Sequence, residues 1–126
     1  MVTAADAIQT YPVGAGRKQA RQADAFITRC GAGYKVHSPA AVDGTLGSFL
    51  IANLTQDMAM VTLPARVVLA GVGPVDLPSQ HVAEFALRSG AGGEHSYSVV
   101  MKPAGGGLVT AQGSSDPVII IDPPNP

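Results

Sequence analysis

The segment from residue 94 to residue 122 constrains the fold most strongly, because apolar strand-like runs alternate there with residues that end strands. Residues 95–101 are rich in β-branched and aromatic side chains, whereas residues 102–107 read KPAGGG. A second run follows at residues 108–112, and residues 118–121 are four β-branched apolar residues in succession. Successive side chains of a strand point to opposite faces of a sheet. We therefore expect residues 118–121 to be covered on both faces and to lie centrally in the fold.

The same pattern extends back to residue 25. Further candidate strands are residues 26–30, 34–37, 47–55, 58–63, 66–70, 75–78 and 81–88. Residues 81–88 could also form a helix, but alternation places Ala83, Phe85 and Leu87 on one face, which favours a strand. Together the runs predict about seven to nine short strands with turn signals every eight to twelve residues, typical of an antiparallel sandwich or barrel.

This pattern resembles that of immunoglobulin-like or cupredoxin-like antiparallel β-sandwiches over residues 26–122. The immunoglobulin hallmarks of paired cysteines and a buried tryptophan are absent, since the chain has one cysteine and no tryptophan. The copper ligands of cupredoxins have no counterpart either, because Cys30 lies far upstream of His95 and Met101. The resemblance implies an architecture, and neither family's activity follows from it.

We expect three parts in the chain: an N-terminal basic arm at residues 1–24, a β-sandwich domain at residues 25–122, and a proline-rich tail at residues 123–126. Residues 4–10 could form one or two helical turns, which the proline and glycines of residues 11–16 would end. With few large apolar side chains, the arm cannot bury enough surface to fold alone. It is either a mobile tail or a segment that becomes ordered against another surface, extended or weakly helical.

Charge is distributed unevenly along the chain, although the formal net charge is only −1. Residues 1–35 hold five Lys or Arg against two Asp, a balance of +3, and the remaining residues hold three against seven acidic residues, a balance of −4. With so small a net charge, the chain as a whole has no electrostatic field that would attract nucleic acid or a membrane surface. The arm can instead dock on the acidic body of a neighbouring subunit or on another protein. The candidate partner-binding residues are Tyr11, Arg17, Lys18 and Arg21.

No segment predicts export or membrane insertion. No run reaches the roughly 18 apolar residues of a membrane helix, and the first thirty residues lack the pattern of a signal peptide. We therefore expect synthesis in the cytosol. Asn53-Leu54-Thr55 matches the glycosylation sequon, but it lies inside a strand pattern, so we interpret it as a chance occurrence.

The histidines predict no metal site. His37, His81 and His95 lack the close spacing that makes a metal site recognisable from sequence, and scattered histidines usually lie at strand ends. We therefore expect no metal ligands and no cofactor.

A serine nucleophile is a further candidate, through Ser96, Ser98, Ser114 or Ser115 with His95 and Asp116. No Gly-x-Ser-x-Gly elbow is present, and alternating serines are typical of the solvated face of a strand, so we expect no catalytic residues. Cys30 beside Arg29 could be a reactive thiol, but an isolated cysteine in a strand is more often a small buried residue.

The sequence thus favours a non-enzymatic structural or assembly module whose N-terminal arm docks on a neighbouring subunit or partner protein. This construction resembles that of virion structural proteins, including capsid decoration and tail proteins. Two alternatives stay open: a cupredoxin-like protein that binds a metal or small ligand, and a small serine hydrolase.

Overall fold

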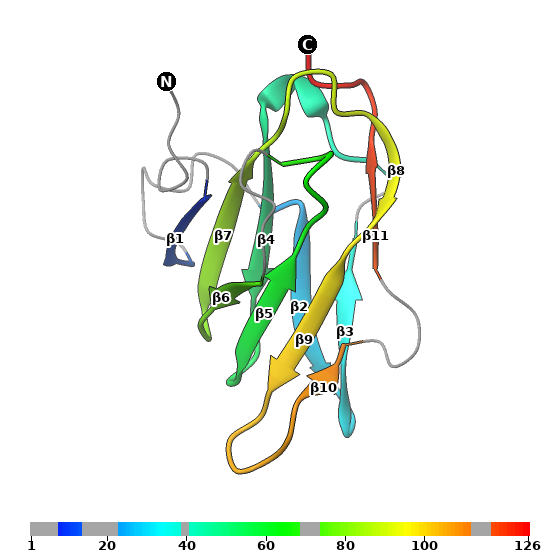
Figure 1. The fold of residues 1–126 in the computed structure, drawn as a ribbon. Coiled ribbons are helices and arrows are strands. Elements are labelled where there is room, and N and C mark those ends of the chain that lie inside the picture. Colours follow the sequence, from blue (N-terminus) through cyan, green and yellow to red (C-terminus); the bar gives the residue numbers. More distant parts are fainter. Residues whose placement is uncertain (1–7, 14–22, 39–40, 69–73, 112–116) are drawn as a thin grey trace.

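The protein folds into stacked β-sheets. A computed structural model describes residues 8–13, 23–38, 41–68, 74–111 and 117–126. These ranges contain eleven strands and one turn of 3₁₀ helix at Gly44–Leu46, arranged as two main sheets and a two-stranded ribbon (Figure 1). The prediction of an all-β protein is confirmed.

The larger sheet has five strands in the order β1-β7-β4-β2-β3. Their bounds are β1 (Ile8–Pro12), β7 (His81–Ala86), β4 (Ser48–Asn53), β2 (Ala25–Cys30) and β3 (Gly33–His37). Neighbouring strands are antiparallel, except that β2 and β4 run parallel. Strands β1 and β3 are therefore the two edges of this sheet.

The smaller sheet has four strands in the order β10-β9-β5-β6, and a separate ribbon pairs β8 with β11. The bounds are β10 (Val109–Thr110), β9 (Ser98–Lys102), β5 (Met58–Thr62), β6 (Val75–Leu77), β8 (Gly93–Ser96) and β11 (Val118–Ile121). The run at residues 95–101, predicted as one strand, is thus divided between β8 and β9. It divides at Tyr97, which is buried and makes an edge-to-face contact with Phe49 at 5.8 Å between ring centroids.

The main core lies between the sheets and follows the predicted alternation. Ala83, Phe85 and Leu87 are buried in it, so the preference for a strand at residues 81–88 was correct. Val82, on the opposite face of β7, is also buried, in a second cluster on the outer face of the five-stranded sheet. Burial of a large apolar side chain contributes about 1.5–3 kcal/mol, so strands buried on both faces hold this sheet together.

The expectation that residues 118–121 lie centrally is wrong. Within the described residues, strand β11 pairs with β8 and forms one isolated parallel bridge, between Ile121 and Val42. Its alternate side chains have different surroundings: Ile119 and Ile121 are buried, whereas Ile120 is 38% exposed. The apolar run includes one residue that faces solvent because the strand lies at the margin of the sandwich. Composition alone does not distinguish a central strand from such a marginal one.

Two further local expectations also differ from the structure. Residues 8–10, placed in a helical turn, belong to β1, so the sheet begins before residue 25. In the run at residues 66–70, the described residues form a turn followed by an isolated bridge between Val68 and Leu87, and residues 69–70 lie outside the described ranges. Pro64 accepts backbone hydrogen bonds from Val67 and Val68, and these bonds favour the turn over a strand.

The proline-rich tail packs on the body of the domain. The backbone N–H of Asn125 donates to the Ala91 carbonyl at 2.9 Å, and the Asn125 side chain donates to the carbonyls of Leu87 and Arg88 at 3.1 and 3.0 Å. Gly44 lies so close to this tail that a Cβ atom there would be 2.5 Å from the Pro123 carbonyl oxygen. Contact with the tail therefore requires glycine at this position.

Candidate functional site

The N-terminal strand β1 completes one edge of the five-stranded sheet. It pairs antiparallel with β7 in a register that sets Tyr11 opposite Val82 and Gln9 opposite Glu84. Tyr11 is only 6% exposed, packs with Leu50, Ala52 and Val82, and its hydroxyl donates to the Glu84 carboxylate at 2.7 Å. Tyr11 is therefore the residue that fastens β1 to the sheet.

The structure places only one of the four predicted partner-binding residues. Tyr11 contacts its own sheet, whereas Arg17, Lys18 and Arg21 lie outside the described residues. A role of these three cations in docking stays a prediction. No local pattern indicates the pairing of Tyr11, because its partners Val82 and Glu84 lie far along the chain.

The three histidines each have separate surroundings. His37 stacks on Phe26 at 4.7 Å and shares a hydrogen bond with Thr28 at 2.8 Å, and His81 contacts the Ser79 carbonyl at 2.9 Å. Strands β3 and β7 are separated by β2 and β4, so His37 and His81 are roughly 14 Å apart across the sheet. Among the described residues, no three His, Cys, Asp or Glu side chains are grouped closely enough to hold a metal ion.

His95 is held by an arginine and a backbone carbonyl. Arg66 Nε donates to His95 Nδ1 at 2.9 Å, and His95 Nε2 contacts the Gly92 carbonyl at 2.7 Å. An arginine can only donate, so Nδ1 accepts and Nε2 carries the proton. Both ring nitrogens of His95 therefore contact groups other than Ser96 and Ser98. The other residues of the proposed nucleophile site, Ser114, Ser115 and Asp116, lie outside the described residues.

Cys30 is exposed at the end of β2, so the expectation of a small buried residue is wrong. Its neighbour Arg29 is also exposed but contacts the next strand. The Arg29 guanidinium carbon lies 5.3 Å from the ring centroid of Tyr34, the residue directly opposite it on β3. Arg29 Nε also donates to the Gly31 carbonyl at 3.1 Å.

The turn between β4 and β5 is organised by Asn53, the residue of the apparent sequon. Asn53 is completely buried, and its amide nitrogen donates to the carbonyls of Asp57 and Leu77 at 2.8 and 3.0 Å. Its amide oxygen accepts from the backbone N–H and the hydroxyl of Thr55 at 3.0 and 2.7 Å. In the folded chain this side chain is engaged in structure, which agrees with interpreting the sequon as a chance occurrence.

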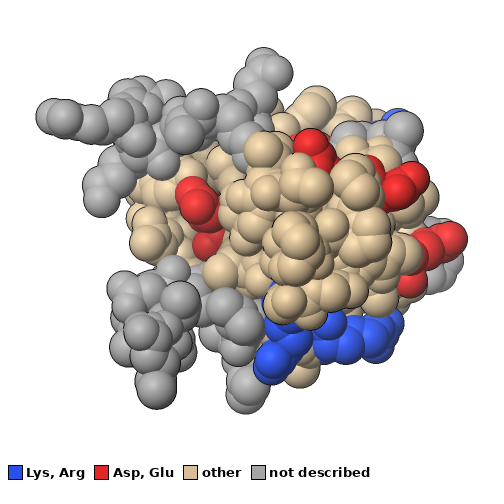
Figure 2. All heavy atoms as spheres, turned by 90° about the horizontal axis from the view of Figure 1, so that it is seen from above, with Lys and Arg blue, Asp and Glu red and all other residues tan. Residues whose placement is uncertain are grey.

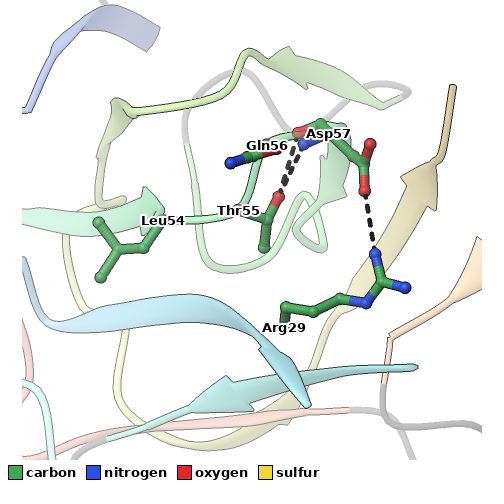
Figure 3. Close-up of a pocket in the computed structure, with 5 residues that line it drawn as sticks. All are labelled: Arg29, Leu54, Thr55, Gln56 and Asp57. Atoms are coloured by element: carbon green, nitrogen blue, oxygen red, sulfur yellow. Dashed lines mark hydrogen bonds and ion pairs between the residues drawn. The ribbon is translucent and has the colours of Figure 1, made fainter. Parts of the chain in front are cut away.

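A pocket of about 350 Å³ opens between this turn and the end of β2, lined by Arg29, Leu54, Thr55, Gln56 and Asp57 (Figure 3). Asp57 Oδ2 accepts a hydrogen bond from the Tyr34 hydroxyl at 2.6 Å and lies 3.8 Å from Arg29 Nη1. The hydrogen bond to Asp57, with burial and the charge of Asp57, raises the pKa of Tyr34. Sequence reasoning missed this pocket, although Arg29 and Tyr34 flank a glycine turn whose register would have paired them.

Most of the basic side chains visible from above lie together. In this view the main group of Lys and Arg lies along one side of the molecule, and acidic side chains are spread over its other sides (Figure 2). Arg66 and Arg88 come from adjacent turns, since Arg88 donates from its backbone N–H to Val67 at 2.8 Å and from its side chain to the Ala65 carbonyl. On the face seen in Figure 2, most basic side chains are therefore separated from the acidic ones.

Comparisons of the chain with protein-family models, with curated proteins and with solved structures gave no match. Within the described ranges, no helix has the length and apolar character of a transmembrane span.

Proposed function

We propose that the protein is a non-enzymatic structural module that assembles through its N-terminal segment, with β1 of one copy completing the five-stranded sheet of a neighbouring copy. The observation that carries this proposal is the edge position of β1, which pairs with β7 and is fastened by Tyr11. The assembly is a homo-oligomer or lattice of the kind formed by capsid decoration or tail proteins of virions. That comparison is one of architecture.

Exchange of β1 between copies preserves its contacts. The backbone groups of β7, the apolar cluster around Val82 and the Glu84 carboxylate are the same in every copy. A strand supplied by a neighbour therefore meets the register and partners that it has in its own chain, and the cost of exchange is low. Val13 donates to Gln80 next to β7 and Asp24 donates to Leu50 of β4, so exchange requires that only the connection between these two residues differ.

Charge supports association between copies. The cations Arg17, Lys18 and Arg21 lie five to nine residues beyond the end of β1, whereas the residues after position 35 carry a balance of −4. A positively charged segment of one copy attracts the negatively charged domain of another copy, which favours their association. In an assembly this weak contact is repeated many times, and the repetition strengthens binding. We further propose that the sandwich is of the immunoglobulin-like or cupredoxin-like class.

The test is a disulfide placed across the proposed junction. In a Cys30→Ser background, Pro12→Cys and His81→Cys put two thiols directly opposite each other at the end of the β1–β7 pairing, at a Cα separation of about 4.5–5.5 Å that a disulfide tolerates, and they leave Tyr11 and Glu84 unchanged. After oxidation, strand exchange predicts covalent dimers and higher species on non-reducing gels. The covalent fraction should rise with the protein concentration at which the chain was refolded.

A matched control uses a pair that cannot exchange in the same way. Thr28→Cys and Lys35→Cys face each other across the β2–β3 hairpin, so their disulfide should close within one chain. Covalent dimers from the Pro12–His81 pair but not from the control support the proposal. Closure of both pairs within single chains at every concentration refutes it.

A further inference from the structure

The pocket at the end of β2 contains an arginine that is already held in position. Arg29 Nε donates to the Gly31 carbonyl at 3.1 Å, and its guanidinium lies over the Tyr34 ring at 5.3 Å. Its Nη1 is 3.8 Å from Asp57, an ion-pair distance that is too long for a hydrogen bond. The guanidinium is thus oriented by three contacts, and within the described part of the chain its Nη donors have no hydrogen-bond acceptor.

Asp57 positions Arg29 and has little capacity for a ligand. Its side chain is 15% exposed, against 57% for Arg29, and it already accepts from the Tyr34 hydroxyl at 2.6 Å. A cationic ligand would have to displace this arrangement. An anionic ligand, in contrast, can accept hydrogen bonds from Nη groups of Arg29 that are exposed and held in a fixed orientation.

The other walls of the pocket include an aliphatic side chain and an amide side chain. Leu54 is 40% exposed, and Gln56 is exposed on the same turn with no hydrogen bond from its side chain within the described residues. In Figure 3, Arg29 reaches from β2 toward Asp57, and Leu54 and Gln56 extend from the opposite side of the turn. The site therefore combines a guanidinium with an apolar wall and an amide.

We infer that this pocket binds a carboxylate carried on a short aliphatic stem. A planar carboxylate matches the two-pronged end of a guanidinium in a bidentate pair, and the stem packs against Leu54. A phosphate dianion fits less well, because the neighbouring Asp57 carboxylate repels its second charge. This inference is independent of strand exchange, since none of the residues that line the pocket belongs to β1.

The test follows backbone amide NMR signals of residues 54–57 in the ¹⁵N-labelled full-length chain. The probes are N-acetylated, C-amidated Ala-Glu-Ala, the matched Ala-Gln-Ala peptide, butyrate and inorganic phosphate. We expect saturable shifts with Ala-Glu-Ala and butyrate, weaker ones with phosphate, and none with Ala-Gln-Ala. Tighter binding of the peptide identifies a glutamate side chain of a protein partner as the ligand, and tighter binding of butyrate identifies a free acid.

Variants assign the effect to the pocket. Arg29→Gln should weaken binding of the probes about tenfold or more, because it removes a charge-assisted pair, and Arg29→Lys should weaken it less. Arg66→Gln, a change at an exposed arginine that contacts His95 elsewhere, should leave it unchanged. Thermal melting checks that each variant is folded. Absence of saturable shifts with both acids, equal response to Ala-Gln-Ala, or unchanged affinity in folded Arg29→Gln would overturn the inference.

Discussion

Among substitutions that remove an amide side chain, Asn53→Ala should destabilise the domain most. Asn53 is completely buried and makes four hydrogen bonds, to Thr55 N, Thr55 Oγ1, the Asp57 carbonyl and the Leu77 carbonyl. Each contributes about 1 kcal/mol net, and the partners left behind are poorly placed to find water. Asn53→Ala should therefore lower the free energy of unfolding by about 4 kcal/mol, a large part of the 5–15 kcal/mol typical of a domain.

The assay is urea denaturation followed by circular dichroism, with Asn125→Ala as the matched control. Asn125 makes two side-chain hydrogen bonds and is half-buried, so water can replace its amide at a cost of about 1 kcal/mol. The slope of the unfolding free energy against urea should stay constant in both variants, because the folded core is unchanged. A loss for Asn53→Ala no larger than that for Asn125→Ala would refute the reasoning.

Two further predictions concern packing and pH. Gly44→Ala places a Cβ atom 2.5 Å from the Pro123 carbonyl oxygen and 2.6 Å from Asn125 N, so it should lower the free energy of unfolding by about 1–3 kcal/mol. Gly107→Ala is the control, because a Cβ atom there meets nothing within 4 Å. Equal melting temperatures of the two variants would contradict this prediction. Burial raises the pKa of Tyr97 above its ordinary value of 10.0, while a weak hydrogen bond with Ser38 lowers it, so the folded chain holds this proton more tightly than the unfolded chain. The resulting stability is complete below about pH 10 and is lost as pH rises through the folded-state pKa. Tyr97→Phe should therefore retain its melting temperature better than the natural chain between about pH 9 and pH 11, and parallel decline of the two would contradict the assignment.

The strands that could be predicted from sequence are those whose signal is local. Residues 26–30 are a short run that a glycine turn ends, and residues 81–88 place Ala83, Phe85 and Leu87 on one face; strands form there at Ala25–Cys30 and His81–Ala86. Pro78 correctly marked β6 as an edge strand, since a proline cannot donate to a further partner.

Pairing over long distances accounts for what the sequence did not show. Whether Ile120 is covered depends on which strands flank β11, and the division between β8 and β9 depends on the contact of Tyr97 with Phe49. Strand β1 was missed because five residues with one aromatic side chain carry little signal until β7 provides their partners.

The pocket was missed for a related reason, since it combines the end of one hairpin with a distant turn. Two local signals were nevertheless present. The register across the Gly31–Gly33 turn sets Arg29 opposite Tyr34, and the Asn53-x-Thr55-x-Asp57 spacing suits a turn built from side-chain hydrogen bonds. Each signal indicates local structure only. That the hairpin end and the turn lie next to each other is visible only in the folded structure.

The most direct test of assembly through β1 is the solution mass of the natural chain, measured by light scattering from low micromolar concentration to the highest that stays soluble. Strand exchange predicts a weight-average mass that rises with concentration above that of one chain. A chain that keeps the mass of a single copy across the whole range would contradict the account.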